Sequence, residues 1–458
     1  MLRLPSFALL VCSLAVTGLS ACDGTPTTDA GDGDGDGDGD GDGDGDDDAG
    51  VVDAGDGDGD GDGDGDGGVV VDGGDLDAGD GDVDAGVGDA GDVVDGGDTC
   101  DPVALAAIEA DIVDGLSAID DGVDFSVHVE NAAGRAIVYD RGASTMATVI
   151  DSASTAKWIS ASVILAFVHS AENLASPTPL TLDSRPQDFL TVDEWPVPSG
   201  DSLEGIELRH LLSFTSGLTE EPNCIKLGTP LNSTLSSCVG LVGAANFTLG
   251  KVPGAGFYYA GTHLHVAAQM AVRARDIALG VNDSTWHAIF DTFKAETGVL
   301  STAMYSLPTL QNPRIAGGIR LNGGEYVDFL RAFFHRTLLV DHSSTGAVDL
   351  HDLQILDHRA AAVTEYSPAM DGPLALDWHY GFGLWLECVP DAVPYDCSGV
   401  DVVSSAGAYG AYPFMSRSGG YFGFVSREGA LGTGFIGYDH FGAVKDDVAT
   451  WAAMNCAP

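Results

Sequence analysis

Residues 99–458 predict an α+β fold, in which helices and strands follow one another along the chain. The spacing of apolar residues predicts a helix over 103–119, and a strand follows over 125–129. A short Ala-Gly-Arg turn leads to a second strand over 136–139. A continuous apolar stretch over 158–168 then predicts a buried helix.

The first 21 residues have the features of a lipoprotein signal peptide. A charged start at Arg3 precedes an apolar run over 7–16, and the sequence Leu-Ser-Ala-Cys ends at Cys22. We therefore expect cleavage after Ala21 and a lipid on Cys22, which would hold an exported protein in the cell envelope or at the cell surface. The alternative is an ordinary signal peptide, cut near Ala21 without a lipid.

Residues 22–98 predict a disordered tether behind that lipid. Beyond Cys22 they are almost entirely Gly, Asp, Ala and Val, with 29 Asp and no Lys or Arg. Such a composition cannot bury a core, and its charges repel one another. The alternative is calcium binding by the carboxylates, but ordered calcium loops also use a bidentate Glu, and this segment has no Glu.

The remaining 360 residues, 99–458, are acidic in their own right. The tether and Arg3 account for −28 of the formal charge of −51, which leaves −23 for this part. Nucleic acid and anionic lipid surfaces require positive charge, so neither is expected as a partner. The length suits one large domain or two intimately packed subdomains.

Six cysteines remain once the signal peptide and Cys22 are set aside: Cys100, Cys224, Cys238, Cys388, Cys397 and Cys456. An even number in an exported chain indicates disulfides, and six cysteines allow fifteen pairings. Proximity favours Cys224 with Cys238 and Cys388 with Cys397, and Cys100 with Cys456 would then join the ends of the domain. No Cys-x-x-Cys or His-Glu-x-x-His spacing occurs, so no metal site is expected.

Ser154 and Lys157 form the most informative pair in the chain. They stand three residues apart at the start of the apolar helix, so they share one helical face. A buried lysine can lose its proton and act as a base toward a neighbouring hydroxyl. Asp151 is expected to cap this helix. No Gly-x-Ser-x-Gly occurs, which disfavours an α/β-hydrolase.

Further motifs follow Lys157 in a set order. They are the segments 206–218 (IELRHLLSFTSGL), 253–261 (PGAGFYYAG), 316–319 (AGGI) and 380–385 (YGFGLW). Through these motifs the chain resembles the serine β-lactamase-related superfamily, and specifically its branch of class C β-lactamases, D-amino-acid peptidases and esterases. The resemblance covers about residues 103–456. Phe214 replaces a His of the family pattern.

The resemblance implies a β-lactamase/transpeptidase-like fold. This fold has an antiparallel sheet flanked by helices and a mostly helical lobe, here inserted at about 160–370, with the site between them. It also implies a small acyl ester or amide as substrate and no cofactor.

Three side chains take catalytic roles by this resemblance. Ser154 would be the acylated nucleophile, Lys157 its partner in the base system, and Tyr259 the second base. A phenol titrates near pH 10, and an adjacent ammonium would stabilise its phenolate. Neighbouring Tyr258 is the alternative to Tyr259. A family Asn falls on Gly261, a departure that puts efficient turnover of lactams or peptides in doubt.

A third family element lines the site with a strand, and two segments compete for it. The favoured one is Ser405, Ala406 and Gly407, and its rival is Arg417, Ser418 and Gly419. With the favoured segment, the backbone N–H groups of Ser154 and Ala408 would form the oxyanion hole. That segment carries no cation, which favours neutral esters or amides over the carboxylate-bearing β-lactams and peptidoglycan stems.

The sequence as a whole predicts a lipid-anchored serine hydrolase that acts through an acyl-enzyme on Ser154. His263 and His265 are interpreted as packing or surface histidines rather than site residues. The alternative function is a degenerate penicillin-binding-like protein that binds cell-wall fragments or a partner without turnover. A further alternative is a calcium-responsive surface protein that acts through its tether.

Overall fold

The structure is a computed structural model that describes residues 100–169, 179–226, 233–338, 349–359, 361–388, 397 and 402–458. The predicted signal peptide, the lipid site at Cys22 and the tether lie outside the described residues.

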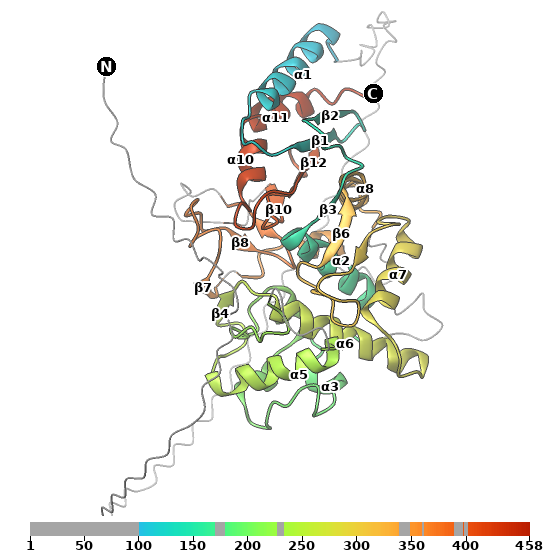
Figure 1. The fold of residues 1–458 in the computed structure, drawn as a ribbon, viewed down its shortest axis with the longest axis vertical. Helices are drawn as coiled ribbons and strands as arrows, with labels where there is room; N and C mark the ends of the chain where they lie inside the picture. Colours follow the sequence, from blue (N-terminus) through green and yellow to red (C-terminus); the bar gives the residue numbers. More distant parts are fainter. Residues whose placement is uncertain are drawn as a thin grey trace, which may run out of the picture. The chain divides into compact units, whose positions relative to one another are not determined.

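A seven-stranded antiparallel sheet forms the centre of one half of the domain (Figure 1). Its strand order is β2-β1-β12-β11-β10-β9-β8, so the first strands of the domain pair with the last ones. The strands are β1 (Phe125–Asn131), β2 (Ala136–Asp140), β8 (His379–Tyr380), β9 (Trp385–Leu386), β10 (Val402–Ser404), β11 (Tyr412–Ser416) and β12 (Tyr421–Arg427).

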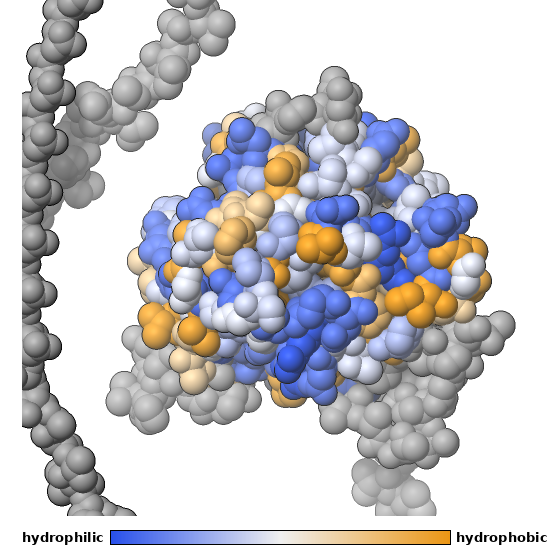
Figure 2. Space-filling view, turned by 90° about the horizontal axis from the view of Figure 1, so that it is seen from below, coloured by the Kyte–Doolittle hydropathy of each residue, from blue (hydrophilic) through white to orange (hydrophobic). Residues whose placement is uncertain are grey.

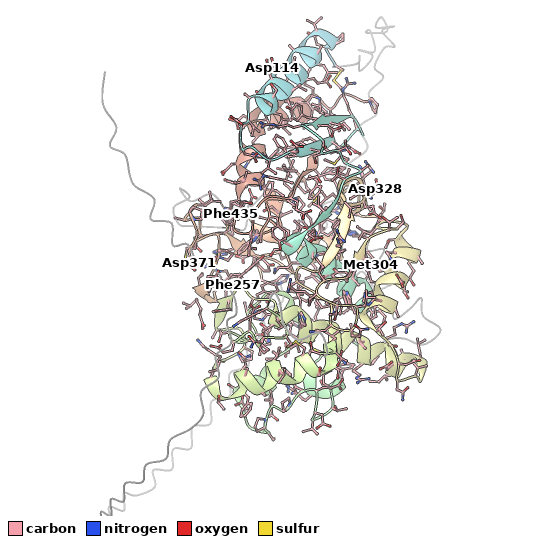
Figure 3. The ribbon with its side chains drawn as sticks, in the orientation of Figure 1. Asp114, Phe257, Met304, Asp328, Asp371 and Phe435 are labelled. Carbon is pink, nitrogen blue, oxygen red and sulfur yellow. A yellow bond between two sulfur atoms is a disulfide. The ribbon has the colours of Figure 1, made fainter. Side chains whose placement is uncertain are left out.

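Helices cover both faces of this sheet. One face carries α1 (Pro102–Ser117), α10 (Ile436–Gly442) and α11 (Lys445–Ala453), and the other carries α2 (Ala156–His169) and α8 (Gly323–Phe334). Successive side chains of a strand point to opposite faces of the sheet, so the sheet separates two layers of the hydrophobic core. Val127 faces the layer with α1 and α11, whereas the ring of Phe424 stacks on Tyr326 of α8, with the ring centroids 4.6 Å apart. Figure 3 labels exposed Asp114 and Asp328 on helices of the two opposite faces.

A mostly helical lobe adjoins the sheet and is centred on α6. Thirteen residues of α6 are buried, because α2, α3, α4, α5 and α7 all pack against it. Its helices are α3 (Pro186–Phe189), α4 (Leu208–Leu212), α5 (Leu235–Asn246), α6 (Thr262–Leu279) and α7 (Trp286–Thr297). The short α9 (Leu350–Gln354) lies instead beside α8, where His351 packs against Phe333 at 5.1 Å.

Two small sheets complete the architecture. One has the antiparallel order β3-β6-β5, and in the other β4 pairs in parallel with β7. Their strands are β3 (Val149–Asp151), β4 (Gly256–Tyr258), β5 (Met304–Tyr305), β6 (Ile319–Asn322) and β7 (Val363–Tyr366).

Three disulfides join the cysteines in the pairs that proximity favoured. Cys100 bonds Cys456, which links the start of α1 to the end of the chain, with Cα atoms 5.5 Å apart. The two local pairs are Cys224–Cys238 and Cys388–Cys397.

The start of the Ser154 helix differs from the prediction. Ser154 lies in a single 3₁₀ turn, Ala153–Thr155, and the α-helix begins only at Ala156. Asp151 does not cap the helix, because β3 pairs with β6 and sets Asp151 opposite Arg320, whose Nε lies 2.7 Å from the carboxylate.

The exposed surface of the helical lobe is mixed in character. Viewed from below, hydrophilic and hydrophobic residues are interspersed over its coloured area (Figure 2). Within the described parts of the chain, no helix has the length and apolar character needed to cross a membrane.

Candidate active site

Ser154 and Lys157 meet where the β3 strand gives way to α2. Ala153, just ahead of Ser154, has a φ of +49°, so the chain turns sharply between strand and helix. Lys157 lies in the first turn of α2, and its Nζ donates to Ser154 Oγ at 2.8 Å and to the Ala316 carbonyl at 2.9 Å. The amine is therefore held against the hydroxyl by a second, fixed acceptor.

The Lys157 amine is poised to exchange a proton near neutral pH. Its side chain is buried, and this desolvation lowers the pKa of Lys157 to about 7. The carboxylate of Glu221 opposes that fall, and the guanidinium of Arg314 adds to it. A substantial share of the molecules therefore carries a neutral amine at pH 7, ready to accept a proton from Ser154.

Tyr259 lies on the other side of Ser154. It follows β4, and its backbone N–H donates to the Tyr366 carbonyl of β7 at 3.0 Å. The ring stacks on Trp385 at 4.9 Å, and Lys157 Nζ lies 4.6 Å from the ring centroid. The Tyr259 hydroxyl is hydrogen-bonded to the Ser154 side chain.

The protonation of Tyr259 differs from the sequence-based expectation. An adjacent ammonium was expected to favour the phenolate, but burial raises the pKa of Tyr259 well above 10.0, and the hydrogen bond with Ser154 only partly offsets this rise. Tyr259 is therefore a neutral phenol near pH 7, suited to relay or donate a proton. The lysine, whose pKa falls, is the better resting base.

Phe214, which stands where the resemblance predicts a His, packs against this tyrosine. Phe214 has a φ of +61°, and its carbonyl accepts a hydrogen bond from Tyr258 N at 3.1 Å. Its ring packs against Tyr259 at 5.6 Å and stacks on His263 at 4.8 Å. The substitution thus keeps an aromatic support behind the phenol.

The segment that follows β10 lies beside Ser154. Ser405 Oγ donates to the Ser154 carbonyl at 3.1 Å, and a Cβ at Gly407 would lie 2.4 Å from the Ser152 carbonyl, so only glycine fits there. The Gly407 carbonyl accepts a hydrogen bond from Gly410 N at 2.8 Å. Because this carbonyl and the Ala408 N–H belong to the same planar peptide group, the bond also fixes the direction of the Ala408 N–H. Ala408 and Ser154 line the same cavity.

The rival segment is placed elsewhere, which corrects that alternative. Arg417, Ser418 and Gly419 form the turn between β11 and β12 and do not line the cavity. Arg417 pairs with Asp352 and lies over the ring of Phe333 at 5.5 Å. Its cation is therefore committed to a packing role away from Ser154.

Glu221 adjoins the position of the family Asn. Its carboxylate accepts a hydrogen bond from Gly261 N, and a Cβ at Gly261 would begin 3.1 Å from the Glu221 Oε1 atom. Sequence analysis missed this residue, although it stands only four positions after the Ser-Gly of the 206–218 motif. A carboxylate thus adjoins the place where the motif predicts an amide.

A cavity of about 730 Å³ opens over Ser154. Its apolar wall includes Leu307, Pro308 and Leu431, and Tyr366 and Tyr409 add phenol groups. Arg314 and Glu221 bring opposite charges to the same space. Sequence analysis also missed Arg314, two positions before the Ala-Gly-Gly motif, because charge next to a motif does not by itself reveal which way a side chain points.

The remaining candidates have structural partners. Tyr258 does not line the cavity, and its ring packs on Tyr366 at 5.4 Å. Buried His263 contacts Ser216 Oγ and the Tyr258 carbonyl, both at 2.8 Å, and buried His265 contacts the Gly261 carbonyl at 3.3 Å.

Among the described residues, one group has the composition of a metal site: His379, Cys388 and Cys397. Its two sulfur atoms are joined in a disulfide, so they are not available as thiolate ligands.

A large antiparallel sheet between helices, with an adjoining helical lobe, is the architecture found in solved β-lactamase and penicillin-binding-protein structures. Solved structures share the fold. A protein from Bacteroides dorei described as a candidate β-lactamase is 22% identical, with a TM-score of 0.54 over 76% of this chain and 99% of its own. The hydrolase EstCE1, described as having promiscuous acyltransferase activity, is 16% identical, with a TM-score of 0.53 over 76% and 100%.

A β-lactamase/D-alanine carboxypeptidase from Yersinia pestis is 15% identical, with a TM-score of 0.51 over 78% of this chain and 100% of its own. No protein-family model matches the sequence, and the comparison with curated proteins gives no match. The chain therefore has the fold of the β-lactamase-related superfamily, and the predicted fold class is confirmed.

The charges around Lys157 predict a pH dependence with opposite shifts in two variants. If the neutral amine is the base, kcat/KM for an ester rises with pH and levels off above the Lys157 pKa of about 7. Because Glu221 raises this pKa and Arg314 lowers it, Glu221→Gln should move the rise to lower pH and Arg314→Gln to higher pH. Stopped-flow pH profiles check both signs, and shifts in the same direction would contradict the assignment.

Proposed function

We propose that this protein is a serine hydrolase that cleaves small acyl esters or amides through an acyl-enzyme on Ser154. The observation that carries the proposal is the 2.8 Å contact between Ser154 Oγ and a lysine amine whose pKa is lowered to about 7. A hydroxyl beside such an amine is an activated nucleophile.

Acylation begins when Ser154 Oγ attacks the substrate carbonyl carbon. The hydroxyl proton passes to Lys157 Nζ, and the carbonyl oxygen becomes an oxyanion that the N–H groups of Ser154 and Ala408 stabilise. When the intermediate collapses, the bond to the leaving group breaks. Tyr259 donates its proton to the departing oxygen or nitrogen and is reprotonated from Lys157, so the base system returns to its starting state.

Deacylation repeats these steps with water as the nucleophile. Water attacks the acyl carbon, gives up a proton to the Lys157–Tyr259 pair, and the acid is released as Ser154 regains its proton. Esters are favoured over amides, because an alkoxide or phenolate leaves with less protonation than an amine. Gly261 also lacks the amide side chain that the family pattern supplies.

The test is to locate the acyl group during turnover. The exported protein is mixed with p-nitrophenyl butyrate, quenched within the burst, and digested for mass spectrometry. We expect one butyryl group on the peptide that contains Ser154, followed by release and further turnover. An acyl group on another residue, or none with hydrolysis unchanged, would overturn the proposal. Acylation of Ser154 without release would favour the binding protein that does not turn over.

The proposal includes a location. The features of residues 1–22 support export and a lipid on Cys22, and residues 23–98 would then separate the hydrolase from the membrane surface. Mass spectrometry of the mature N-terminal peptide tests this, because a peptide that begins at Cys22 and carries the mass of a lipid is expected, and an unmodified peptide mass would exclude the lipid.

A further inference from the structure

Arg314 brings a cation into the cavity from a loop outside the predicted catalytic motifs. This arginine precedes β6, and its side chain lies partly buried in the wall beside Ser154. If Gly317 carried a Cβ atom, that atom would lie 3.6 Å from Arg314 Cδ and 3.4 Å from the backbone carbonyl carbon of Ala153. The side chain is thus held close to the turn that carries Ser154.

Within the described parts of the chain, one hydrogen bond anchors the Arg314 guanidinium group. Arg314 Nε donates to the Ile225 carbonyl at 2.9 Å, which fixes the direction of the planar group. Its Nη2 atom is buried and has no hydrogen-bond partner among the described residues. A buried charged donor without a partner is unfavourable, and an incoming acceptor would relieve that cost.

The neighbouring carboxylate does not bond to this atom. Glu221 accepts from Gly261 N. Burial lowers the pKa of Arg314 and the charge of Glu221 opposes this fall, but within the described chain no carboxylate lies within ion-pair distance of the Arg314 guanidinium. The domain that surrounds the cavity is strongly acidic, so a cation kept in the cavity without a paired carboxylate stands against the overall charge. Such an arrangement fits an anion that enters with the substrate.

We propose that Arg314 recognises a carboxylate on the substrate, so that the preferred substrates are esters or amides carrying a carboxylate near the scissile bond. A planar guanidinium matches a carboxylate in a bidentate geometry, and the low dielectric of a partly closed cavity strengthens the pair. This inference rests on the proposed hydrolase function. It reverses the preference for neutral substrates that the lack of a cation after β10 predicted.

The experiment compares esters in matched pairs. One pair is mono-p-nitrophenyl adipate and its methyl ester, with the carboxylate on the acyl chain. The other is 4-butyryloxybenzoate and its methyl ester, with the carboxylate on the leaving group. We expect kcat/KM to be about tenfold or more higher for the anionic member of at least one pair, mainly through a lower KM, and salt should weaken this preference.

Three variants isolate the role of the cation. Arg314→Gln should abolish the preference, whereas Arg314→Lys should restore part of it, because a charge remains without the bidentate geometry. The ratio within a pair cancels any change in the base Lys157. Arg336→Gln makes the same charge change at an exposed residue that pairs with Asp349 and Asp352, and it should leave the ratio unchanged.

Calorimetry with the Ser154→Ala protein separates this inference from the proposed function. Monomethyl adipate should bind more tightly than dimethyl adipate, and Arg314→Gln in the same background should remove the difference. If the esters are hydrolysed without an anionic preference, the hydrolase stands and the inference is wrong. If no ester is hydrolysed but the acid binds through Arg314, the carboxylate-binding role of Arg314 stands and the hydrolase is wrong. Equal binding of both compounds would overturn the inference.

Discussion

Replacing Ser154 with alanine is expected to lower kcat/KM for p-nitrophenyl butyrate by at least about 10⁴-fold, because the variant lacks the hydroxyl that would carry the acyl group. Ser154 Oγ is hydrogen-bonded to Lys157 Nζ at 2.8 Å and to the Tyr259 hydroxyl, so the variant removes the atom on which the proton transfers converge. Activity that remains would come from substrate binding and the backbone donors. Steady-state kinetics and the loss of the burst phase measure the effect.

Ser152→Ala is the matched control for this variant. Ser152 is also buried, but its hydroxyl donates to the Ile319 carbonyl at 3.1 Å and takes no part in the Ser-Lys-Tyr cluster. The Ser152→Ala substitution should lower the free energy of unfolding by about 1 kcal/mol and leave the burst phase intact. Equal losses of activity in the two variants would mean that disturbance of the β3–α2 junction, rather than loss of a nucleophile, explains the Ser154 result.

Local sequence signals predicted the β-strands of the first hairpin well. The strands predicted over 125–129 and 136–139 are part of β1 and β2, because alternating apolar side chains and a short turn specify a hairpin without long-range information. The register of β1 against β12 could not be predicted this way, since it joins residues about 300 positions apart, such as Phe125 and Arg427. It depends on packing of the whole sheet between its two helical layers.

In the candidate site, too, local sequence signals predicted the neighbouring residues, whereas contacts between distant segments could not be predicted. Spacing alone set Ser154 beside Lys157, because three residues correspond to one turn, even though that turn is 3₁₀ rather than α. The charges that tune the lysine were not predicted, since Glu221 and Arg314 reach it from distant loops. The protonation of Tyr259 was also misjudged, because its pKa depends on the desolvation of a ring packed between Trp385 and Phe214, which no motif reveals.

Lys157→Met is expected to lower kcat/KM by about 10³-fold, since it removes the resting base and leaves the nucleophile in place. The rise of activity near pH 7 should disappear with it. The same variant should increase the free energy of unfolding near pH 6. Burial lowers the Lys157 pKa from 10.5 to about 7. At pH values below 7, the buried protonated amine therefore lowers the free energy of unfolding by about 5 kcal/mol.

The gain from Lys157→Met is smaller than that cost, because the Ala316 carbonyl loses its donor, a loss of about 1–3 kcal/mol. A net increase of about 2–4 kcal/mol near pH 6 follows from these two effects. The lysine penalty is complete below the folded pKa of about 7 and declines as pH rises toward the unfolded value of 10.5. Urea unfolding near pH 6 and pH 9 should therefore show a larger gain at the lower pH.

Lower stability of Lys157→Met at both pH values would contradict this account and would make Lys157 a structural residue. A variant that is more stable and nearly inactive would instead mean that the fold tolerates a costly buried amine because the chemistry at Ser154 requires one.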